Sequence, residues 1–385
     1  MPKEPAIQSL TVQNLLSFGD KPEVIELRNL NVLIGPNGSG KSNLIEVIGL
    51  LQAAPTDLAK AINKGGPIEE WLWKGGGSKT PPTASIEVVV RRGDGETPLR
   101  YRLAFARAAD YRFGITDELI AGDQTNFARG PWWLQGGHMS LGDLMSWPGP
   151  QSSILAALKD RKHYPEITHL GELFSTFSLY GQWEFGSRAA IREPCDVGLE
   201  NRWLEEDSSN LGLILNRLLS QPPVKHQLIE SLRTFLDGTK DLLTSIVGSK
   251  VQTRLEEDGL AATIPLNRVS DGVVRWLALL AILLNPDPPP LICIEEPELG
   301  LHPDMVHEIA QLLIAASERT QLIITTHSDK LIEHFTEMPE AVVVCEKEEG
   351  ASHFQRLDAS QLEAWLQKYS LGELWRKGHI GGNRW

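Results

Sequence analysis

Cysteine is scarce in this 385-residue chain, and long apolar runs are missing from it. Its three cysteines, Cys195, Cys293 and Cys345, are too few and too scattered for a disulfide framework or a zinc site. The longest uninterrupted apolar run covers residues 276–284, far short of the roughly 20 residues that span a bilayer. The first five residues, Met-Pro-Lys-Glu-Pro, lack the apolar core of a signal peptide. We therefore expect a soluble, cytoplasmic protein without a membrane partner.

An excess of positive charge is also absent. With 37 basic and 50 acidic residues, the formal net charge is −13. This balance argues against a surface built as a whole to bind nucleic acid, but it leaves room for a local basic groove. The composition, 41% hydrophobic and 23% charged, is typical of a globular chain, and the length fits one large domain or two to three smaller ones.

Strand and helix patterns alternate in the last third of the chain. Helices are expected at residues 270–284, 303–316, 330–335 and 361–368, and strands at 291–295, 321–326 and 341–346. Such alternation predicts a parallel sheet with covering helices. Nearer the amino terminus, strands are expected at residues 7–15, 24–27, 31–34, 86–92 and 100–106, with a helix that starts at Ser42.

The middle of the chain is less regular. Glycine, proline and tryptophan crowd together between residues 120 and 200, which predicts an irregular insert with short helices. Helices are predicted at residues 210–219 and 224–236. A hairpin is predicted over residues 242–264, with its turn near Asp258 and Gly259.

A glycine-rich segment at residues 35–42, Gly-Pro-Asn-Gly-Ser-Gly-Lys-Ser, fits the pattern G-x-x-x-x-G-K-[ST] at every position. Glycines let successive backbone N–H groups approach phosphate oxygens, Lys41 supplies a charge, and Ser42 offers a hydroxyl to Mg²⁺. The alternative is a glycine-rich turn with an unrelated lysine, which the preceding apolar strand and the following amphipathic helix disfavour. The predicted nucleotide-binding residues are Gly35, Pro36, Asn37, Gly38, Ser39, Gly40, Lys41, Ser42 and Asn43.

Two adjacent carboxylates, Glu295 and Glu296, end an apolar strand. Carboxylates at the end of a buried strand are costly unless a positive group lies there. We predict Mg²⁺ held by Glu295, with Glu296 orienting or deprotonating the attacking water. The alternative is a strand that simply leaves the core for solvent. His327 ends another apolar strand, where the carboxyl ends of parallel strands meet, and we predict that it contacts the γ-phosphate.

Ser270, followed by Asp271 and Gly272, precedes a strongly apolar helix. Serine is a good N-cap residue, which is a complete structural explanation. A second anion site at the amino end of that helix is an equally good one. From the residues alone, both interpretations stay open.

Together these motifs resemble those of ABC-type ATPases of the RecF, OLD and SMC group. Residues 292–303, Ile-Cys-Ile-Glu-Glu-Pro-Glu-Leu-Gly-Leu-His-Pro, resemble the Walker B motif and D-loop of that group. Residues 269–272 resemble its signature motif, and residues 325–328 its switch histidine. Residues 371–378 resemble the tail of a bacterial subgroup of "predicted ATPases" without a coiled coil or Toprim domain.

The resemblance implies an α/β P-loop NTPase fold of the ABC-ATPase head type: a mixed or parallel sheet, covering helices and a compact inserted lobe. It implies ATP and Mg²⁺ as cofactors, with Glu296, His327 and Ser270 in catalysis and Gly272 in nucleotide binding. It also implies a dimer that encloses ATP, in which Ser270 and Gly272 of one chain face the γ-phosphate bound by Lys41 of the other. This favours the functional interpretation of Ser270.

Two residues depart from the wider family, and one assignment stays open. Glu295 stands where many cassette ATPases have aspartate, and Asp271 where they have glycine; both are common in the OLD-like branch. The glutamine of the Q-loop is open among three candidates, which are Gln124, Gln135 and Gln182.

No sustained heptads lie between Lys41 and Ser270, so a long coiled coil of the SMC type is excluded. We predict an ATPase head in residues 1–130 and 251–385, and a compact lobe, as in RecF, in residues 131–250. After Glu296 there is no Asp-x-Asp signature or acidic cluster of an OLD-type Toprim nuclease.

We therefore expect a dimerising ATPase switch in DNA maintenance or repair, or in anti-phage defence, that controls a separately encoded nuclease or toxin. The alternative is a nucleotide-gated scaffold that sequesters such a partner, with slow or incidental hydrolysis. DNA itself stays open as a partner.

Tryptophans and arginines in and near the insert allow two interpretations each. The tryptophans could stack on single-stranded bases, but filling an irregular core is favoured; they are Trp71, Trp73, Trp132, Trp133, Trp183 and Trp203. The basic residues could follow phosphates or form a solvated face interleaved with acids; they are Arg91, Arg92, Arg100, Arg102, Arg107, Arg161, Lys162, Arg188, Arg192 and Arg202.

Overall fold

The computed structural model describes residues 4–75, 82–93, 95–108, 112–122, 126–129, 134–135, 149–181, 183–186 and 189–382. The chain forms two compact units. The phosphate-loop unit comprises Glu4–Phe177 and Met338–Trp385, and it contains residues 35–42. The carboxylate unit comprises Ser178–Glu337, and it contains Glu295 and Glu296.

An antiparallel sheet forms much of the phosphate-loop unit, with strand order β2-β1-β4-β5-β6-β7-β8. Its strands are β1 (Ile7–Gln13), β2 (Glu23–Glu26), β4 (Ala84–Val90), β5 (Leu99–Arg107), β6 (Phe113–Ala121), β7 (Asn126–Arg129) and β8 (Leu134–Gln135). In β4 every second residue is buried, as expected for a strand with one face on the core.

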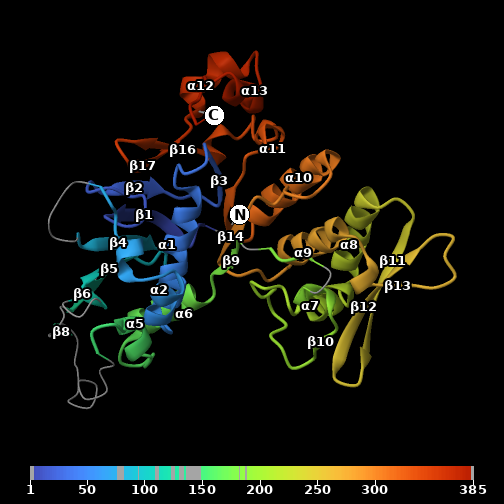
Figure 1. The fold of residues 1–385 in the computed structure, drawn as a ribbon, viewed down its shortest axis with the longest axis horizontal. Helices are drawn as coiled ribbons and strands as arrows, with labels where there is room; N and C mark the ends of the chain where they lie inside the picture. Colours follow the sequence, from blue (N-terminus) through green and yellow to red (C-terminus); the bar gives the residue numbers. More distant parts are fainter. Residues whose placement is uncertain are drawn as a thin grey trace. The chain divides into compact units, whose positions relative to one another are not determined.

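Three further strands of this unit carry the phosphate loop. Strand β3 (Leu30–Ile34) pairs in parallel with β16 (Val342–Glu348), and β17 (Ala351–Arg356) pairs with β16 in antiparallel fashion. The helices of the unit are α1 (Lys41–Ala53), α2 (Leu58–Lys64), α3 (Ile68–Trp71), α5 (Ile154–Ala157), α6 (Pro165–Ser175), α12 (Ala359–Leu366) and α13 (Leu371–Arg376), with a 3₁₀ turn, η4, at Pro339–Ala341. Figure 1 shows α12 and α13 beside the hairpin of β16 and β17, at the red end of the chain.

The carboxylate unit has a parallel set of strands in which β14 (Leu291–Glu295) pairs with both β9 (Ser178–Tyr180) and β15 (Gln321–Thr325). Its helices are α7 (Leu211–Leu219), α8 (Pro222–Phe235), α9 (Asp271–Leu283), α10 (Val306–Ser317) and α11 (Asp329–Glu333), with 3₁₀ turns η1 (Ala190–Arg192), η2 (Leu266–Arg268) and η3 (Pro303–Met305). The run of apolar residues noted in the sequence forms most of α9, which is buried on all sides.

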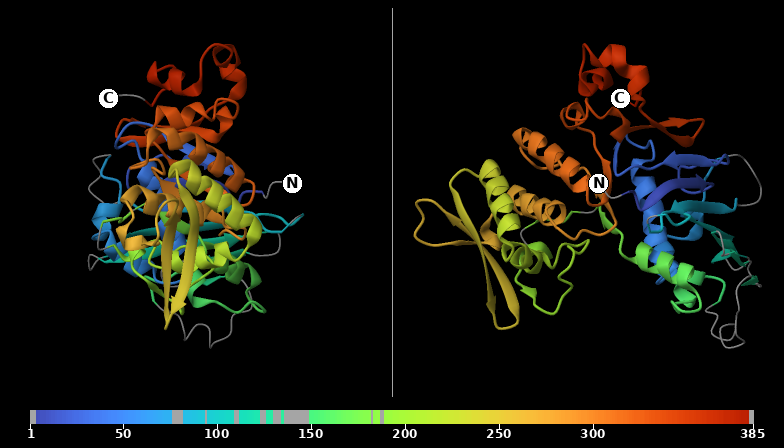
Figure 2. Two further views of the ribbon diagram at one scale, coloured as in Figure 1. Left: turned by 90° about the vertical axis from the view of Figure 1, so that its right-hand side faces the viewer. Right: turned by 180° about the vertical axis from the view of Figure 1, so that it is seen from behind.

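A second, antiparallel sheet of the carboxylate unit has the order β10-β12-β11, with β13 also paired to β12. These strands are β10 (Cys195–Asp196), β11 (Thr239–Val247), β12 (Lys250–Glu257) and β13 (Ile264–Pro265). Both views in Figure 2 show the long hairpin of β11 and β12 next to α7 and α8.

Most predicted elements are confirmed, and the parallel pairing of the predicted strands is confirmed in both units. The predicted hairpin over residues 242–264 contains two turns rather than one. Val247 pairs with Lys250, so the chain turns first at Gly248, whose φ of 63° suits glycine. The predicted turn at Asp258 and Gly259 follows β12 and leads to β13, which pairs back with β12. The three-part division into head and lobe stays a prediction, although its boundary between residues 250 and 251 falls inside β12.

No helix in the described parts of the chain is both long and apolar enough to cross a lipid bilayer. Cys195, Cys293 and Cys345 are buried free thiols, so the latter two serve as small core residues, as expected.

Candidate functional site

The phosphate loop, residues 35–42, connects β3 with α1, and the predicted order of strand, loop and helix is present. Every residue of β3 is buried, and α1 begins at Lys41. Gly40 occupies the N-cap position with a φ of 106° and has no side chain to bond the first amides of α1. The first amides of a helix lack intrahelical partners, and its dipole favours an anion there. This geometry fits a bound phosphate.

The Lys41 side chain is held beside the loop that precedes it. It is 6% exposed, and its Nζ donates to the carbonyl oxygens of Gly35 at 2.7 Å and Pro36 at 3.0 Å. Ser39 is buried, and its Oγ has no hydrogen-bond partner in the described structure. Because buried polar atoms rarely lack a partner, a phosphate oxygen is a fitting acceptor for this hydroxyl. At the tip and rim of the loop, Asn37, Gly38 and Ser42 are exposed.

The hairpin of β16 and β17 packs against the phosphate loop. This contact was not predicted from the sequence. An ideal Cβ on Gly35 would lie 2.1 Å from the Cys345 carbonyl oxygen, and one on Gly40 would lie 2.3 Å from Ser352 Oγ. Ser352 Oγ donates to Ser17 Oγ at 2.6 Å. Asn43, a predicted nucleotide-binding residue, donates from Nδ2 to the same Ser17 oxygen at 2.7 Å. Its side-chain amide thus anchors α1 to this support.

Gly35→Ala is expected to lower the free energy of unfolding by about 3 kcal/mol, because the new Cβ overlaps the Cys345 carbonyl and the φ of 148° disfavours alanine. Gly38→Ala is the matched control: its φ is 77°, but nothing lies within 4 Å of its ideal Cβ. We expect it to cost only about 1 kcal/mol. Urea unfolding without nucleotide measures both. Equal losses would contradict the close packing of Gly35.

In the carboxylate unit, three parallel strands end at one edge, where Glu295, Glu296 and His327 follow or end them. Ile294 pairs in register with Tyr180, and Glu295 pairs with Thr325. Gly181 therefore follows β9 beside Glu295, and an ideal Cβ on Gly181 would lie 2.5 Å from Glu295 Oε1. The prediction that the strand ends of this sheet gather polar groups is confirmed within this unit.

Glu296 has a strained backbone that several contacts hold in place. Its φ is 45°, which is unusual for a residue other than glycine. The Glu296 amide donates to the Thr325 carbonyl at 3.0 Å, and Arg275 Nη2 donates to the Glu296 carbonyl oxygen at 2.9 Å. Its Oε1 lies 3.9 Å from His327 Nε2, and both side chains are about one-third exposed. Strain of this kind collects at functional sites.

Two further residues at this edge were missed from the sequence. Thr326 is fully buried, and its Oγ1 donates to Glu298 Oε1 while accepting from the Ser328 amide at 2.9 Å. Burial raises the pKa of Glu298. The threonine thus ties the turn after β14 to the segment that carries His327. The position of both residues beside predicted motifs was the available signal.

Ser270 takes the N-cap position of α9, but its side chain makes no capping hydrogen bond, and the residue is exposed. The capping interpretation therefore does not account for its hydroxyl. Gly272, in the first turn of α9, has ordinary contacts: its ideal Cβ would lie 3.4 Å from Phe235 and 3.6 Å from the Gly300 carbonyl oxygen.

A buried arginine positions this motif. Arg192 donates to the carbonyl oxygens of Val269 at 2.6 Å and Leu266 at 3.2 Å, and it forms an ion pair with Asp271. The aspartate that departs from the wider family thus has a partner 79 positions earlier in the chain. From the sequence, Arg192 counted only as one of several basic residues.

The Q-loop candidates have different surroundings. Gln124 and Gln182 lie outside the described residues, and Gln135 belongs to β8 of the phosphate-loop unit. Gln182, however, follows Gly181 directly, and Gly181 lies against Glu295.

The oxygen atoms of Ser42 and Glu295 are of the kind that Mg²⁺ prefers. In the described part of the chain, no group of three or more histidine, cysteine, aspartate or glutamate residues could hold a metal ion.

The tryptophans and arginines in the described residues make contacts within the protein itself. Trp71 is buried, Trp183 stacks on Tyr180 and Phe185, and Trp203 donates to the Asp287 carbonyl. These contacts support the core-filling interpretation. Nearly all of the singled-out arginines pair with acids, which favours the interleaved face; the pairs include Arg91–Glu4, Arg92–Glu96, Arg100–Glu87, Arg102–Asp117, Arg107–Glu69, Arg161–Glu172 and Arg202–Asp287. Trp132, Trp133 and Arg188 lie outside the described residues.

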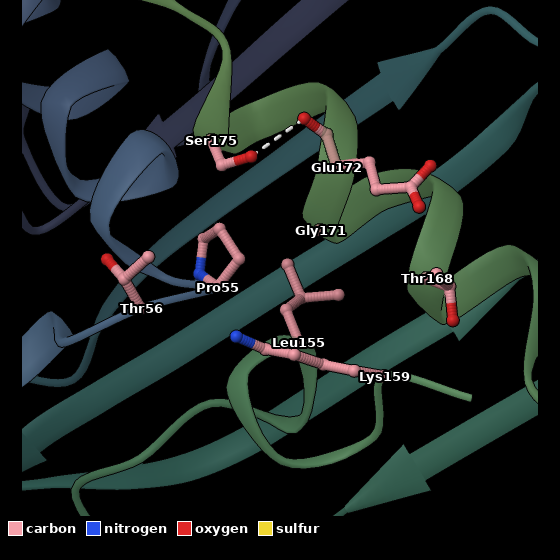
Figure 3. A pocket seen from close by; sticks show the side chains of 8 residues that line it. All are labelled: Pro55, Thr56, Leu155, Lys159, Thr168, Gly171, Glu172 and Ser175. Carbon is pink, nitrogen blue, oxygen red and sulfur yellow. Dashed lines mark hydrogen bonds between the residues drawn. The ribbon is translucent and has the colours of Figure 1, made fainter. Parts of the chain in front are cut away.

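A pocket of about 240 Å³ lies in the phosphate-loop unit, away from these motifs (Figure 3). Its lining comes from the turn after α1, from α5 and the segment that follows it, and from α6. It consists of Pro55, Thr56, Leu155, Lys159, Thr168, Gly171, Glu172 and Ser175. None of the predicted site residues lines it.

Comparison with known families accounts for this set of motifs. Residues 30–333 match a family described as "AAA domain, putative AbiEii toxin, Type IV TA system". The chain belongs to this AAA-domain family. The match contains the phosphate loop and both glutamates, and the chain is accordingly an ATPase.

Two chromosome partition proteins Smc are similar to part of this AAA-domain chain. That of Desulfitobacterium hafniense is 30% identical over 109 residues, 28% of this chain and 9% of its own length. That of Mycobacterium tuberculosis is 26% identical over 117 residues, 30% of this chain and 10% of its own. The chain thus matches only about a tenth of the length of these relatives.

Solved Smc heads share the fold. An Smc head bound to the C-terminal winged-helix domain of ScpA has a TM-score of 0.60 and 16% identity, covering 93% of this chain and 99% of that one. The Smc head from Pyrococcus furiosus, bound to the C-terminal domain of ScpA, has a TM-score of 0.58 and 15% identity, with 94% and 99% covered. These structures confirm the predicted head fold, and the family match confirms the predicted ATPase group.

Proposed function

We propose that this ATPase binds ATP with Mg²⁺ on the phosphate loop and hydrolyses it with Glu296 as the base that orients or deprotonates the attacking water. The main support for this proposal is the structure of the phosphate loop. Gly35 and Gly40 pack so closely that side chains are excluded there, Lys41 is held against the loop, and Ser39 presents a buried hydroxyl without a partner. These features suit phosphate oxygens better than a structural turn.

Each residue then has a stated task. Lys41 binds the β- and γ-phosphates, and the backbone amides of the loop, with Asn37, Gly38 and Ser39, surround them. Ser42 and Glu295 hold Mg²⁺, which neutralises phosphate charge when bound. His327, 3.9 Å from Glu296, contacts the γ-phosphate. Gln182, next to the glycine that lies against Glu295, is the proposed Q-loop glutamine.

Dimerisation around ATP is the second part of the proposal. Ser270 is exposed and makes no capping bond, and Arg192 and Asp271 hold its backbone. Such a preformed, exposed serine can reach a γ-phosphate bound by a second copy, together with Gly272. The Smc heads with this fold bind a winged-helix domain of another protein, which supports a protein partner here as well.

The family description supports a proposal for the partner and the pathway. It names a toxin and a type IV toxin–antitoxin system, which supports control of a separately encoded toxin or nuclease, in anti-phage defence or DNA maintenance. The net charge of −13 and the paired arginines favour the scaffold alternative, because an acidic surface suits a protein partner better than DNA. Partner binding that needs nucleotide but not hydrolysis would distinguish the scaffold from the switch.

Phosphate release from ATP is the direct test. Purified protein with ATP and Mg²⁺ is expected to release phosphate, and chelation of the metal with EDTA is expected to reduce release by at least about a hundredfold, because phosphate charge is then unneutralised. Re-addition of Mg²⁺ should restore the rate. A rate that persists in EDTA would contradict the assignment of Ser42 and Glu295.

A further inference from the structure

The segment of residues 378–382 ends directly against the phosphate loop, within the same unit. Gly382 is buried with a φ of 71°, and its ideal Cβ would lie 3.3 Å from Gly35 Cα and 3.0 Å from Val344 Cγ1. The two glycine backbones are therefore in contact, with no room for a side chain between them. Gly35 is the first residue of the phosphate loop, so this segment bounds the conformations that the loop can adopt.

The carboxylate of Glu346 holds the end of that segment, while backbone hydrogen bonds from Gly378 and His379 hold its start on α13. Glu346 Oε1 accepts a hydrogen bond from the Gly382 amide at 2.9 Å. Gly381, with a φ of 77°, passes so close that its ideal Cβ would lie 3.0 Å from the same oxygen. Glu346 belongs to β16, two residues after Val344, which pairs in register with Ile34 at the start of the loop. Strand β16 thus contributes both the residues that pair with β3 at the start of the loop and the carboxylate that bonds the glycine turn at residues 381–382.

Helix α13 supports the turn from the other side. Leu371, Leu374 and Trp375 are buried, and Ser370 and Glu373 form a capping box at its start. The ideal Cβ of Gly382 would lie 3.3 Å from Trp375 Nε1. Gly382 therefore contacts both α13 and the phosphate loop.

We propose that Glu346, Gly381 and Gly382 form a clasp that positions the phosphate loop for nucleotide, with Glu346 as a positioning residue that acts through Gly35. The proposal rests on ATP being bound by this loop. A loop whose amides already converge loses less freedom when phosphate binds, so the clasp strengthens binding without touching the nucleotide. Because coupling between sites is reciprocal, bound nucleotide in turn stabilises the clasp.

The first test compares two replacements of Glu346. Glu346→Ala removes the acceptor for the Gly382 amide, and we expect the Kd for ATP to rise about tenfold, with kcat at saturating ATP within about twofold of wild type. Glu346→Gln keeps an acceptor oxygen and is expected to restore a Kd within about twofold. Glu348→Ala, an exposed carboxylate on the same strand, is the control. Isothermal titration calorimetry gives the Kd, and phosphate release gives kcat.

The second test places a methyl group in the contact. Gly382→Ala puts a Cβ between Val344 and Gly35, and we expect it also to raise the Kd about tenfold. Gly350→Ala is its matched control: it lies in the turn between β16 and β17 with a φ of 85°, so it has similar backbone strain, but nothing lies within 4 Å of its ideal Cβ. We expect the control to leave the Kd unchanged.

The wild-type protein supplies a test that needs no variant. ATP is expected to slow amide hydrogen exchange in residues 378–382 by at least about fivefold, through the reciprocal coupling. Unchanged exchange, equal Kd values for Glu346→Ala and wild type, or tighter binding by Glu346→Ala would each overturn the clasp; tighter binding would mean that the carboxylate only repels phosphate. Failure of the wild-type protein to bind ATP would instead overturn the proposed function.

Discussion

Replacing Glu296 by glutamine is expected to lower kcat for ATP hydrolysis by at least about a hundredfold and to leave the Kd for ATP within about threefold of wild type. Glutamine keeps the size of the side chain but cannot take a proton from water. The backbone that presents it is held independently of the carboxylate, by the Thr325 carbonyl and by Arg275 Nη2. The variant should therefore keep the fold and the position of the side chain, and lose the chemistry.

The same variant tests the proposed assembly, because ATP that is bound but not cleaved should keep the dimer closed. Light scattering at low protein concentration is expected to show a mass that doubles with ATP and Mg²⁺ and stays single without nucleotide. Glu318→Gln, which changes an exposed carboxylate after α10, is the control and should behave like wild type. Hydrolysis by Glu296→Gln at the wild-type rate would refute the role of the base. A higher mass that ATP does not change would favour the scaffold.

Features of this fold that depend on one continuous stretch of residues were predictable from the sequence. The strand, loop and helix around residues 35–42 are adjacent in the chain, and each has its own local signal: a buried strand, glycines and an amphipathic helix. The apolar strands before Glu295 and His327 were predicted for the same reason. Parallel pairing then follows from the alternation of strands and helices.

Features that join distant segments were not predictable. Ser17 and Ser352 support the loop from positions 335 residues apart, and nothing in either local sequence marks the pair. Strand β17 was missed because it is short and polar, with only Ser352 and Phe354 buried along it. Strand β6 was missed because Glu118, a charged residue, is fully buried in it, which breaks the usual alternation.

The buried position of Glu118 is explained by its hydrogen-bond and ion-pair partners, which a hydrophobicity pattern does not show. Glu118 accepts from the Tyr101 hydroxyl at 2.7 Å and from the Ile154 amide at 2.9 Å, with Arg129 3.4 Å away. Burial raises the pKa of Glu118, and these hydrogen bonds oppose that effect. A carboxylate can therefore occupy a core position when several partners surround it, but the sequence records only the carboxylate.

Replacing Lys41 by alanine is expected to raise the Kd for ATP by about a hundredfold, because charge-assisted contacts to the phosphates are lost and no other residue of the loop is cationic. Hydrolysis at ordinary ATP concentrations should fall with it. The outcome differs in kind from that of Glu296→Gln, in which binding survives and turnover does not. Two variants with opposite effects on binding and chemistry would separate the roles of the two motifs.

The control for Lys41→Ala must allow for its structural contacts. Lys41 Nζ donates to the carbonyl oxygens of Gly35 and Pro36, so its loss could disturb the loop itself. Unfolding by urea without nucleotide reports that disturbance, and Lys60→Ala removes an exposed lysine from α2 of the same unit. A large rise in Kd with little change in unfolding, and none in Lys60→Ala, assigns the lysine to the nucleotide. ATP binding by Lys41→Ala within threefold of wild type would mean that residues 35–42 form a structural turn, and the proposed ATP site would be wrong.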